Sequence, residues 1–405
     1  MFKCRARYLH CPNVHLREHI PLSKTYTLPD QPLPMAANQA SAIKIQWITR
    51  AADIDALAGE WTALESAVQD RTVFSTFDLL ANWYRHYAGP YGGEPLIGIA
   101  RREGALVGVA PLVIQNCRLA GIPVMRVQFA MHESYSGEFL VEDDHPEIIG
   151  AFIDSLATEG KFDVIYLNGI EPGSSRFQTV EQSVKRHRLS IETVNHPNAI
   201  VDLKNGYEGY CNAMSRNFRR TVKRQTHRVT AAGTPIVEGV RLKSGIGELE
   251  SCIERMFSIM EASYKLNGQR IVDFHRSYLA DLARQFAPRG MLHLSILSIG
   301  GKDAAVVMGV VERGCYYDVT LSYVEEFADL SPGAYLMQEV LRDLAASGVH
   351  TLMSHGAHDY KQRWATAFVP GTRVFLFSRS SSSLMSRFIR FRMAPVWRKL
   401  GVMDP

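Results

Sequence analysis

The stretch from Cys315 to Trp364, CYYDVTLSYVEEFADLSPGAYLMQEVLRDLAASGVHTLMSHGAHDYKQRW, decides the fold of this chain. Its β-branched and aromatic residues from Tyr316 to Tyr323 predict a strand, and the amphipathic run from Ala334 to Ala346 predicts a helix. A short strand over 350–354 and a second helix that opens near Asp359 follow. Such a β-turn-helix-β unit is typical of an α/β protein.

The turn Ser331-Pro332-Gly333 between the first strand and its helix is a candidate anion site. The N–H groups of a first helical turn lack partners within the helix, and the helix dipole is positive at that end. Proline suits this turn because it has no N–H, and Gly333 lets a ligand approach the backbone. We expect a phosphate or diphosphate there, and the alternative is a plain helix start with Ser331 as N-cap.

The composition is that of a soluble globular protein. The chain has 405 residues, of which 46% are hydrophobic and 21% charged, with a net charge of +4. Its length favours two domains or two fused repeats. No run approaches the ~18 consecutive apolar residues of a membrane-spanning helix. The mild net charge does not indicate a nucleic acid as partner, so the placement of the charges is more informative.

The cysteines indicate a cytoplasmic protein with reduced thiols. There are six, without a C-x-x-C pair or a histidine at metal-binding spacing, and we expect no metal site. No Ser-His-Asp order occurs, and no dinucleotide-binding glycine pattern is followed by an acid, so hydrolase and oxidoreductase functions are weakly supported.

Two parts of the chain follow the same order of elements. Residues 43–201 alternate strands and helices, and the hairpin from Leu96 to Ile114 resembles the one from Leu292 to Val311. In the first part, Asp53 is expected to cap a helix that ends near Glu65. Residues 1–42 are proline-rich without apolar periodicity, so we expect disorder there, and Met35 is an alternative start of translation.

Two segments concentrate positive charge. The predicted helix from Ser215 to Arg228 lies in a stretch without acids from 209 to 237, so its basic face favours an anionic partner. The tail over 381–405 is basic and carries Leu384, Phe388 and Phe391 on one face. It suits either a membrane interface or docking on the body of the protein.

Several motifs occur together in this chain: SPGAYLMQEVL, the later G-x-x-x-YK pattern of Gly356, Tyr360 and Lys361, and shorter stretches across residues 43–380. In this combination the chain resembles the BioF2-like or CelD-like branch of the GNAT acyltransferase superfamily. It implies an α/β protein of two fused GNAT-like halves, as in the Fem-type aminoacyl transferases. Each half would be a mixed, largely antiparallel sheet flanked by helices. The implied division is 1–42 extension, 43–203 first half, 204–380 second half with the donor site, and 381–405 tail.

The resemblance also implies roles in transferring an acyl group from a thioester to an amine. The donor would be acyl-CoA, with acetyl or a longer acyl group, or an acyl carrier protein. Its diphosphate would lie on the backbone of Ser331, Pro332, Gly333 and Ala334. A backbone amide near Tyr323 would stabilise the oxyanion. Tyr360 would protonate the leaving thiolate, and Lys361 would contact a phosphate or the oxyanion.

The general base and the acceptor site remain open at this point. Candidates for the base are Asp318, which alternates with Tyr317 and Val319 on its strand, His355, and two residues of the first-half loop. Those two, Glu133 and Tyr135, also join the basic residues Arg216, Arg219 and Arg220 as candidate substrate contacts. The chain departs from the family twice. Leu352 to Ser354 lack the usual acid, and the usual Tyr-Asp after the preceding strand is Tyr323-Val324.

The sequence therefore predicts an N-acyltransferase that is cytoplasmic and peripheral to the inner membrane. The amine would belong to an envelope lipid such as a sphingoid base, or to a polysaccharide precursor. One alternative is a Fem-like transferase that uses aminoacyl-tRNA held by residues 215–228. Another is an inactive scaffold in exopolysaccharide (cellulose) synthesis, which the missing family acids make conceivable.

Overall fold

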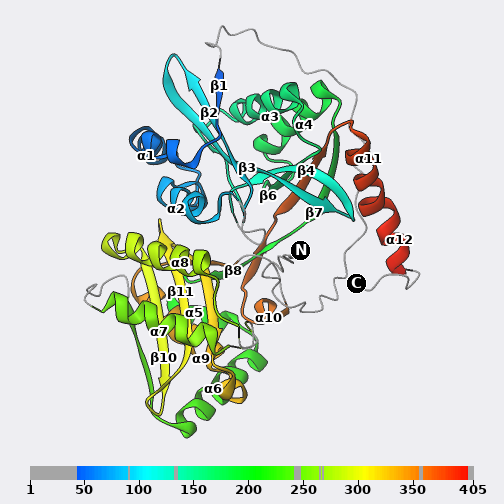
Figure 1. Ribbon diagram of the computed structural model, residues 1–405. Coiled ribbons are helices and arrows are strands. Elements are labelled where there is room, and N and C mark those ends of the chain that lie inside the picture. The colour runs from blue at the N-terminus through cyan, green and yellow to red at the C-terminus, as the bar shows by residue number, and fades with distance from the viewer. Residues whose placement is uncertain are drawn as a thin grey trace, which may run out of the picture.

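The structure is a computed structural model. It describes residues 43–89, 92–131, 136–240, 248–263, 266, 269–354 and 359–399, without the side chains of 359, 360 and 397–399. The expected disorder of residues 1–42 lies outside this part of the chain. Two mixed sheets, each covered by helices, lie one above the other (Figure 1). The fold class predicted from the sequence, two GNAT-like halves, is confirmed.

The two sheets share one strand order. The first runs β1 (Lys44–Ile48), β2 (Glu94–Arg102), β3 (Ala105–Leu119), β4 (Ile122–Phe129), β6 (Val164–Asn168), β15 (Thr372–Phe377) and β7 (Ser190–Asn195), with β5 (Leu140–Val141) against β3. The second runs β9 (Pro235–Val240), β10 (Leu292–Ile299), β11 (Lys302–Glu312), β12 (Cys315–Tyr323), β13 (Thr351–Ser354), β8 (Asn198–Asp202) and β14 (Ala367–Val369). In each, the fourth strand pairs with the fifth in parallel and the other neighbours are antiparallel.

The halves exchange their sixth strands. β8 precedes residue 203 in the chain but pairs with β13 and β14 of the second sheet. β15 precedes residue 380 but pairs with β6 and β7 of the first sheet. These two strands therefore lie outside the halves in which a division at 203 and 380 places them. Hydrophobic pattern alone does not specify which of two similar sheets a short strand joins.

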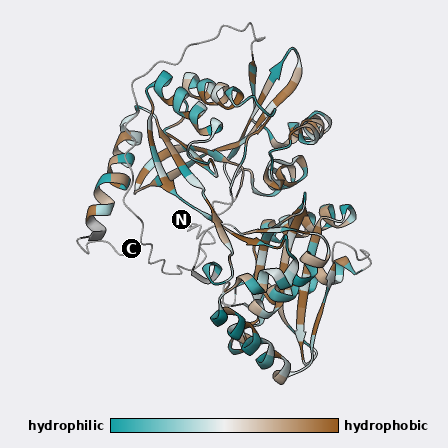
Figure 2. Ribbon diagram, turned by 180° about the vertical axis from the view of Figure 1, so that it is seen from behind, coloured by the Kyte–Doolittle hydropathy of each residue, from teal (hydrophilic) through white to brown (hydrophobic). Residues whose placement is uncertain are grey.

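Helices cover both faces of each sheet. On the first sheet, α1 (Ala58–Ala67) and α2 (Phe77–Tyr87) lie on one face and α3 (Glu147–Glu159) and α4 (Ser175–His187) on the other. On the second sheet, α7 (Leu249–Glu261) and α8 (Asp273–Phe286) lie on one face, and α5 (Gly206–Ala213), α6 (Arg216–Ala232) and α9 (Pro332–Ala346) on the other. The short α10 (Asp359–Gln362) follows β13. The brown of the strands in Figure 2 shows how apolar both sheets are.

The start of α1 differs from the sequence prediction. Asp53 ends a 3-10 turn, Ala51–Asp53, and its carboxylate pairs with Arg50. A second such turn, Asp55–Leu57, intervenes, so α1 begins at Ala58 and Leu57 occupies the N-cap position. Asp53 is therefore not the cap of this helix, because the chain winds more tightly before it.

The two halves share one apolar core. A single buried cluster joins side chains of α1 and α2 to those of α7, α8 and the second sheet. Around it, the Phe74 ring meets the Tyr317 ring edge-on at 5.3 Å, and the nearly buried Arg71 pairs with Glu312 at 2.7 Å. At the α2–α8 contact the Tyr87 hydroxyl lies 2.5 Å from Nδ1 of His275. Apolar burial and these polar contacts hold the halves together.

His275 should make this interface sensitive to acid. Burial lowers its pKa to about 4 from 6.5. Because the unfolded chain binds the proton more readily, stability should fall as the pH drops from 6.5 through 4, by on the order of 2 to 3 kcal/mol in total. The His275→Phe variant should lose this part of the pH dependence. Urea unfolding at a series of pH values would test this, and an unchanged slope in the variant would contradict the prediction.

Candidate functional site

The central feature of the second half is the point at which the pairing of the parallel strands β12 and β13 ends. Their pairing joins Cys315, Tyr316 and Tyr317 to Thr351, Leu352 and Met353. β12 then continues to Tyr323, whereas β13 ends at Ser354. The helix α9 connects the two strands and packs on the same sheet. The ladder between the two strands therefore ends at Tyr317 and Met353, and we call this end of the ladder the strand opening.

β12 carries an irregularity where this opening begins. Met308 of β11 faces Thr320, but the next residue, Gly309, faces Asp318, so Val319 is an extra residue in β12. Such a bulge bends a strand and redirects its neighbours. Tyr317 and Val319 both pack against the core shared by the halves, which fits the expectation that Asp318 faces away from them.

Three polar side chains meet at the opening. The hydroxyl of Ser354 donates to Oδ2 of Asp318 at 2.8 Å, and Nζ of Lys361 lies 3.8 Å from the same oxygen. Ser354 and Lys361 are buried. The other carboxylate oxygen of Asp318, Oδ1, is enclosed and accepts no hydrogen bond from any described residue. An enclosed carboxylate oxygen without a donor is costly, so this site suits a ligand that supplies an N–H or O–H.

Lys361 has an unusual environment for a lysine. Burial lowers its pKa, and the nearby negative charge of Asp318 offsets only part of that effect. Lysines with lowered pKa values occur often at functional sites, although structural ion pairs also produce such shifts. The position of Lys361 at the strand opening, beside an acid, is therefore the more important observation.

The turn Ser331-Pro332-Gly333, which we call the anion corner, offers fewer free amides than the sequence indicates. Ser331 adopts a left-handed conformation with φ of 56°, and its side chain does not cap α9. Its carbonyl accepts from the amides of Ala334 and Tyr335, and its own amide donates to Ala328. Pro332 has no N–H. Among the described residues, Gly333 is thus the only one of this turn whose amide has no acceptor within the chain.

Side chains also approach the corner from β12. A Cβ added to Gly333 would lie 3.0 Å from Leu321 and 3.6 Å from Tyr323. The side chain of Tyr323, whose strand was expected to supply a backbone amide to the oxyanion, therefore lies against the start of α9. An anion at this corner would depend on one amide and the helix dipole, aided by nearby cationic side chains.

One such cation comes from α6. Its helix begins at Arg216, where the Ser215 hydroxyl accepts the amide of Phe218 as N-cap, and the helix runs along α9. At its far end Nη1 of Arg228 donates to the carbonyl of Asp329 at 3.3 Å, two residues before Ser331. Sequence reasoning did not single out Arg228 for the donor site, because only the packing of α6 brings it there.

The remaining predicted residues fall into two groups. Glu133, Tyr135, His355 and the side chain of Tyr360 lie outside the described residues. The helix α6 carries Arg216, Arg219 and Arg220, which are exposed, whereas Asp318 lies on the strand β12. Arg219 is occupied in the fold, because it donates to the carbonyls of Cys211, Asn212 and Met214. Figure 2 shows α6 as a teal helix at the foot of the molecule.

Glu138, near the expected acceptor loop, is a further buried acid that the sequence did not indicate. Burial raises its pKa, although hydrogen bonds from Thr72 and the charge of Arg176 act in the opposite direction. Both the amide and the hydroxyl of Thr72 donate to its Oε2 at 2.9 Å. Because these partners occupy the carboxylate, Glu138 holds the segment at Thr72 rather than offering a vacant acceptor.

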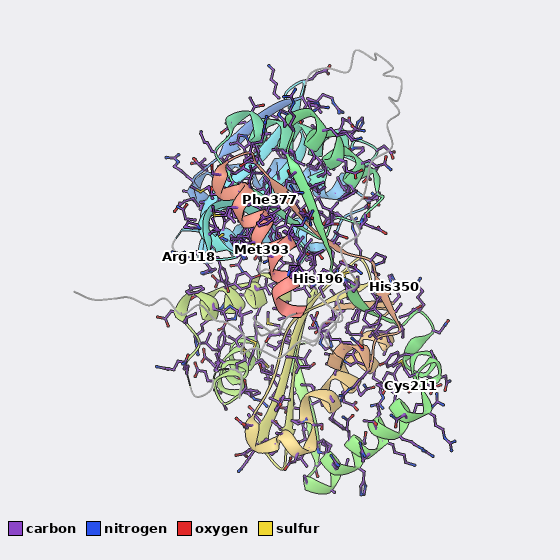
Figure 3. The ribbon with its side chains drawn as sticks, turned by 90° about the vertical axis from the view of Figure 1, so that its right-hand side faces the viewer. Arg118, His196, Cys211, His350, Phe377 and Met393 are labelled. Carbon is purple, nitrogen blue, oxygen red and sulfur yellow. The ribbon has the colours of Figure 1, made fainter. Side chains whose placement is uncertain are left out.

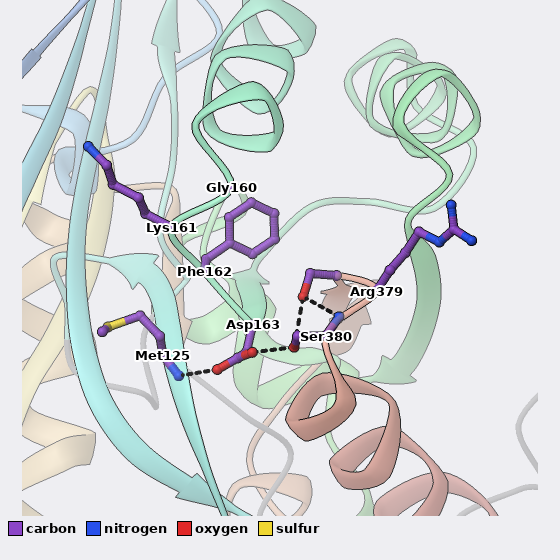
Figure 4. Close-up of a pocket in the computed structure, with 8 residues that line it drawn as sticks. Met125, Gly160, Lys161, Phe162, Asp163, Arg379 and Ser380 are labelled. Atoms are coloured by element: carbon purple, nitrogen blue, oxygen red, sulfur yellow. Dashed lines mark hydrogen bonds between the residues drawn. The ribbon is translucent and has the colours of Figure 1, made fainter.

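A hollow of about 410 Å³ lies elsewhere, between β4, the end of α3 and the start of the tail (Figure 4). Its polar centre is Asp163, which accepts from the Met125 amide and from the hydroxyls of Ser380 and Ser382. Burial alone would raise the pKa of Asp163, but these hydrogen bonds outweigh it and lower the pKa. The hollow belongs to the first sheet and contains none of the predicted catalytic residues. In the part of the chain that the structure covers, no cluster of His, Cys, Asp and Glu could hold a metal ion.

The comparisons with known proteins agree with this geometry. Residues 216–362, which contain Asp318, α9 and Lys361, match the Acetyltransf_6 family, an acetyltransferase (GNAT) domain. The chain therefore contains a GNAT domain in its second half, as the resemblance predicts. No curated protein sequence matches the chain. Its membership of the BioF2-like or CelD-like branch stays a prediction.

The chain is also similar to several solved structures. The structure of FemX has a TM-score of 0.52 to this chain at 12% identity, covering 88% of this chain and 99% of FemX. A tandem GNAT protein from the clavulanic acid biosynthesis pathway has a TM-score of 0.45 at 12% identity, covering 83% and 98%. L-PGS from Bacillus licheniformis has a TM-score of 0.48 at 13% identity, covering 81% and 96%. At such identities the FemX likeness concerns the fold.

Proposed function

We propose that the chain is an N-acyltransferase that moves an acyl group from a thioester, acyl-CoA or acyl carrier protein, to an amine. The amine nitrogen would attack the thioester carbonyl, the carbon–sulfur bond would break, and an amide and a free thiol would result. The acceptor would be the amine of an envelope lipid, such as a sphingoid base, or of a polysaccharide precursor. The GNAT domain at residues 216–362 supports the reaction class.

The enclosed Oδ1 of Asp318 is the observation that carries this proposal. It lies at the mouth of the strand opening, where an amine could donate an N–H to it and later transfer a proton. The resemblance leads us to expect an acid in the strand that contains Ser354. Ser354 instead donates a hydrogen bond to Oδ2 of Asp318. A carboxylate from β12 thus occupies the region in which the family places one from the strand corresponding to β13.

The other roles follow from position and charge. Lys361, as a cation beside Asp318, would stabilise negative charge on the tetrahedral intermediate, because few waters could screen it in this buried site. Tyr360, its neighbour in α10, would protonate the leaving thiolate. The donor diphosphate would contact the Gly333 amide and the Arg228 guanidinium.

Release of free thiol tests the proposal directly. Purified protein should produce thiol from acyl-CoA only when an amine is added, and mass spectrometry should find the matching amide. Asp318→Asn, which keeps the shape but cannot accept a proton, should lower turnover by about 100-fold or more. Absence of both products with every acyl-CoA, acyl carrier protein and amine tried would refute acyl transfer from thioesters.

A second candidate is transfer from aminoacyl-tRNA. The observation in its favour is the outer face of α6, where the exposed Arg216, Arg220 and Arg224 follow one another at helical spacing without an acidic partner among the described residues. Copurification of tRNA that is released steeply by salt would favour this candidate. The acids Glu325, Glu326 and Asp329, which lie on the neighbouring turn η5 (Glu325–Leu330), make the basic surface narrow and favour the thioester donor.

A further inference from the structure

In the tail helix α11 (Ser381–Phe388), polar side chains face the protein and apolar side chains face outward. Its serines Ser383 and Ser386 are fully buried, whereas Leu384, Met385 and Phe388 are 46%, 53% and 56% exposed. A surface helix in water normally shows the reverse arrangement. Among the described residues seven large apolar side chains are exposed, and four of them, these three and Val396, belong to the tail. The apolar stripe of the tail therefore lacks the cover that such residues usually have.

The described part of the tail is attached to the body of the protein, so the exposure of the stripe does not reflect a detached segment. Ser383 donates to the carbonyl of Asp163 at 2.7 Å, and α11 packs on β4 and β15. Beyond it, the ring of Phe391 packs against Phe375 and Phe377 at 5.4 and 5.9 Å. The docking on the protein's own body that the sequence left open thus occurs, through the serines of α11 and through Phe391. Phe391 therefore does not share the exposed face of Leu384 and Phe388 that the sequence predicts for it. The stripe remains outward on a fixed support.

Positive charge surrounds the stripe. From Arg379 to Lys399 the sequence contains no acid. Arg387 and Arg392 both approach one carboxylate, that of Glu192, at 2.8 and 3.0 Å. Arg390 stacks on the Phe375 ring with its guanidinium 5.1 Å from the ring centre, and Arg379 stands at the rim of the hollow beside the first turn of α11. The described acids at this segment are Glu192 and Asp163, so the four arginines outnumber the carboxylates and leave the surface basic.

We propose that the tail is a membrane-docking surface that inserts Leu384, Met385 and Phe388 into the interface of an anionic bilayer. A lipid surface offers the apolar layer that these side chains lack, and anionic head groups complement the surrounding arginines. The segment would lie in the interface without crossing it. None of the described helices combines the length and apolar character that a membrane span needs.

A second copy of the chain fits this surface less well. A two-fold dimer would place the same patch on itself, so the arginines of one copy would face those of the other. An anionic membrane removes that repulsion instead of creating it. Figure 3 shows the tail descending from the first half, near Phe377, past Met393 toward the level of His196 at the junction of the halves. Docking would therefore hold that junction near the lipid surface.

Vesicle flotation with the full chain tests the proposal without any enzyme assay. The protein should float with phosphatidylcholine vesicles that contain phosphatidylglycerol, and less with phosphatidylcholine alone or at high salt. The triple variant Leu384→Ser, Met385→Ser and Phe388→Ser should reduce the bound fraction about tenfold or more. Because the three side chains are already exposed, its thermal stability should stay close to that of the parent.

A matched control is available in the other exposed apolar residues. Changing Ile236, Val272 and Phe368 to serine removes a similar amount of exposed apolar surface away from the tail, and binding should be unchanged. Equal loss in both triple variants would overturn the proposal, as would a parent protein that binds no vesicle. A parent that is dimeric in solution and becomes monomeric on changing the tail residues would assign the stripe to a second copy instead.

Discussion

Replacing Lys361 by methionine should almost abolish thiol release from the acyl donor. The change removes the positive charge that α10 places near Asp318 but keeps the length of the side chain, and Lys361 is only 5% exposed. Loss of one preorganised charge at developing negative charge typically costs ~100- to 1,000-fold in turnover. The KM for the donor should change little. Steady-state kinetics at saturating donor and amine would measure the effect.

The pH profile distinguishes a catalytic charge from a structural one. Because burial lowers the pKa of Lys361 below 10.5, a requirement for its charged form should produce a fall in turnover at alkaline pH, before an ordinary lysine would titrate. In Lys361→Arg, whose side chain stays charged, the remaining activity should lose this alkaline fall. If Lys361→Met retained normal turnover while folding normally, Lys361 would have no direct part in the reaction.

Replacing Gly333 by tryptophan should prevent donor binding. Gly333 is buried, and an added Cβ would lie 3.0 Å from Leu321, so an indole must occupy the space in front of α9 or displace β12. We expect affinity for a non-hydrolysable acyl-CoA analogue to fall by at least about 100-fold, because the Gly333 amide is the remaining donor of the turn. Isothermal titration calorimetry would measure this change.

The smaller variant Gly333→Ala and the distant change Arg228→Gln separate steric from electrostatic effects. Alanine should weaken binding only moderately, because one methyl group can be accommodated by a small shift of the Leu321 side chain. Arg228→Gln should weaken binding mainly at low salt, as expected for a lost phosphate contact. Thermal melting of each variant serves as the folding control. Normal donor affinity in a folded Gly333→Trp protein would remove this corner from the donor site.

Local sequence pattern predicted most elements of the second half. The alternation and hydrophobicity of residues 292–323 match β10, β11 and β12, and the apolar spacing of α9 matches its buried face. These features depend on neighbours in the chain. The shared strand order of the two sheets confirms the fused GNAT-like halves that the resemblance implied.

Features that depend on distant contacts were not predictable in the same way. The extra residue Val319 in β12 results from the pairing with β11, and no residue type in the sequence predicts this bulge. Ser354 reaches Asp318 only because two strands far apart in the chain run in parallel. The left-handed Ser331 accepts from the amide of Ala334, so that among the described residues of this turn only the Gly333 amide is left open. In each case tertiary structure overrides the local preference.

The exchange of β8 and β15 makes each half depend on the other for completion. A fragment cut after residue 203 would keep β8 without the sheet that it joins, and would lack β15 between β6 and β7. Neither half could then be shed, duplicated or grafted alone without leaving an open edge, which is a known route to aggregation. The two chain crossings thus link the halves in both directions. We therefore expect the two halves to be inherited together as one unit.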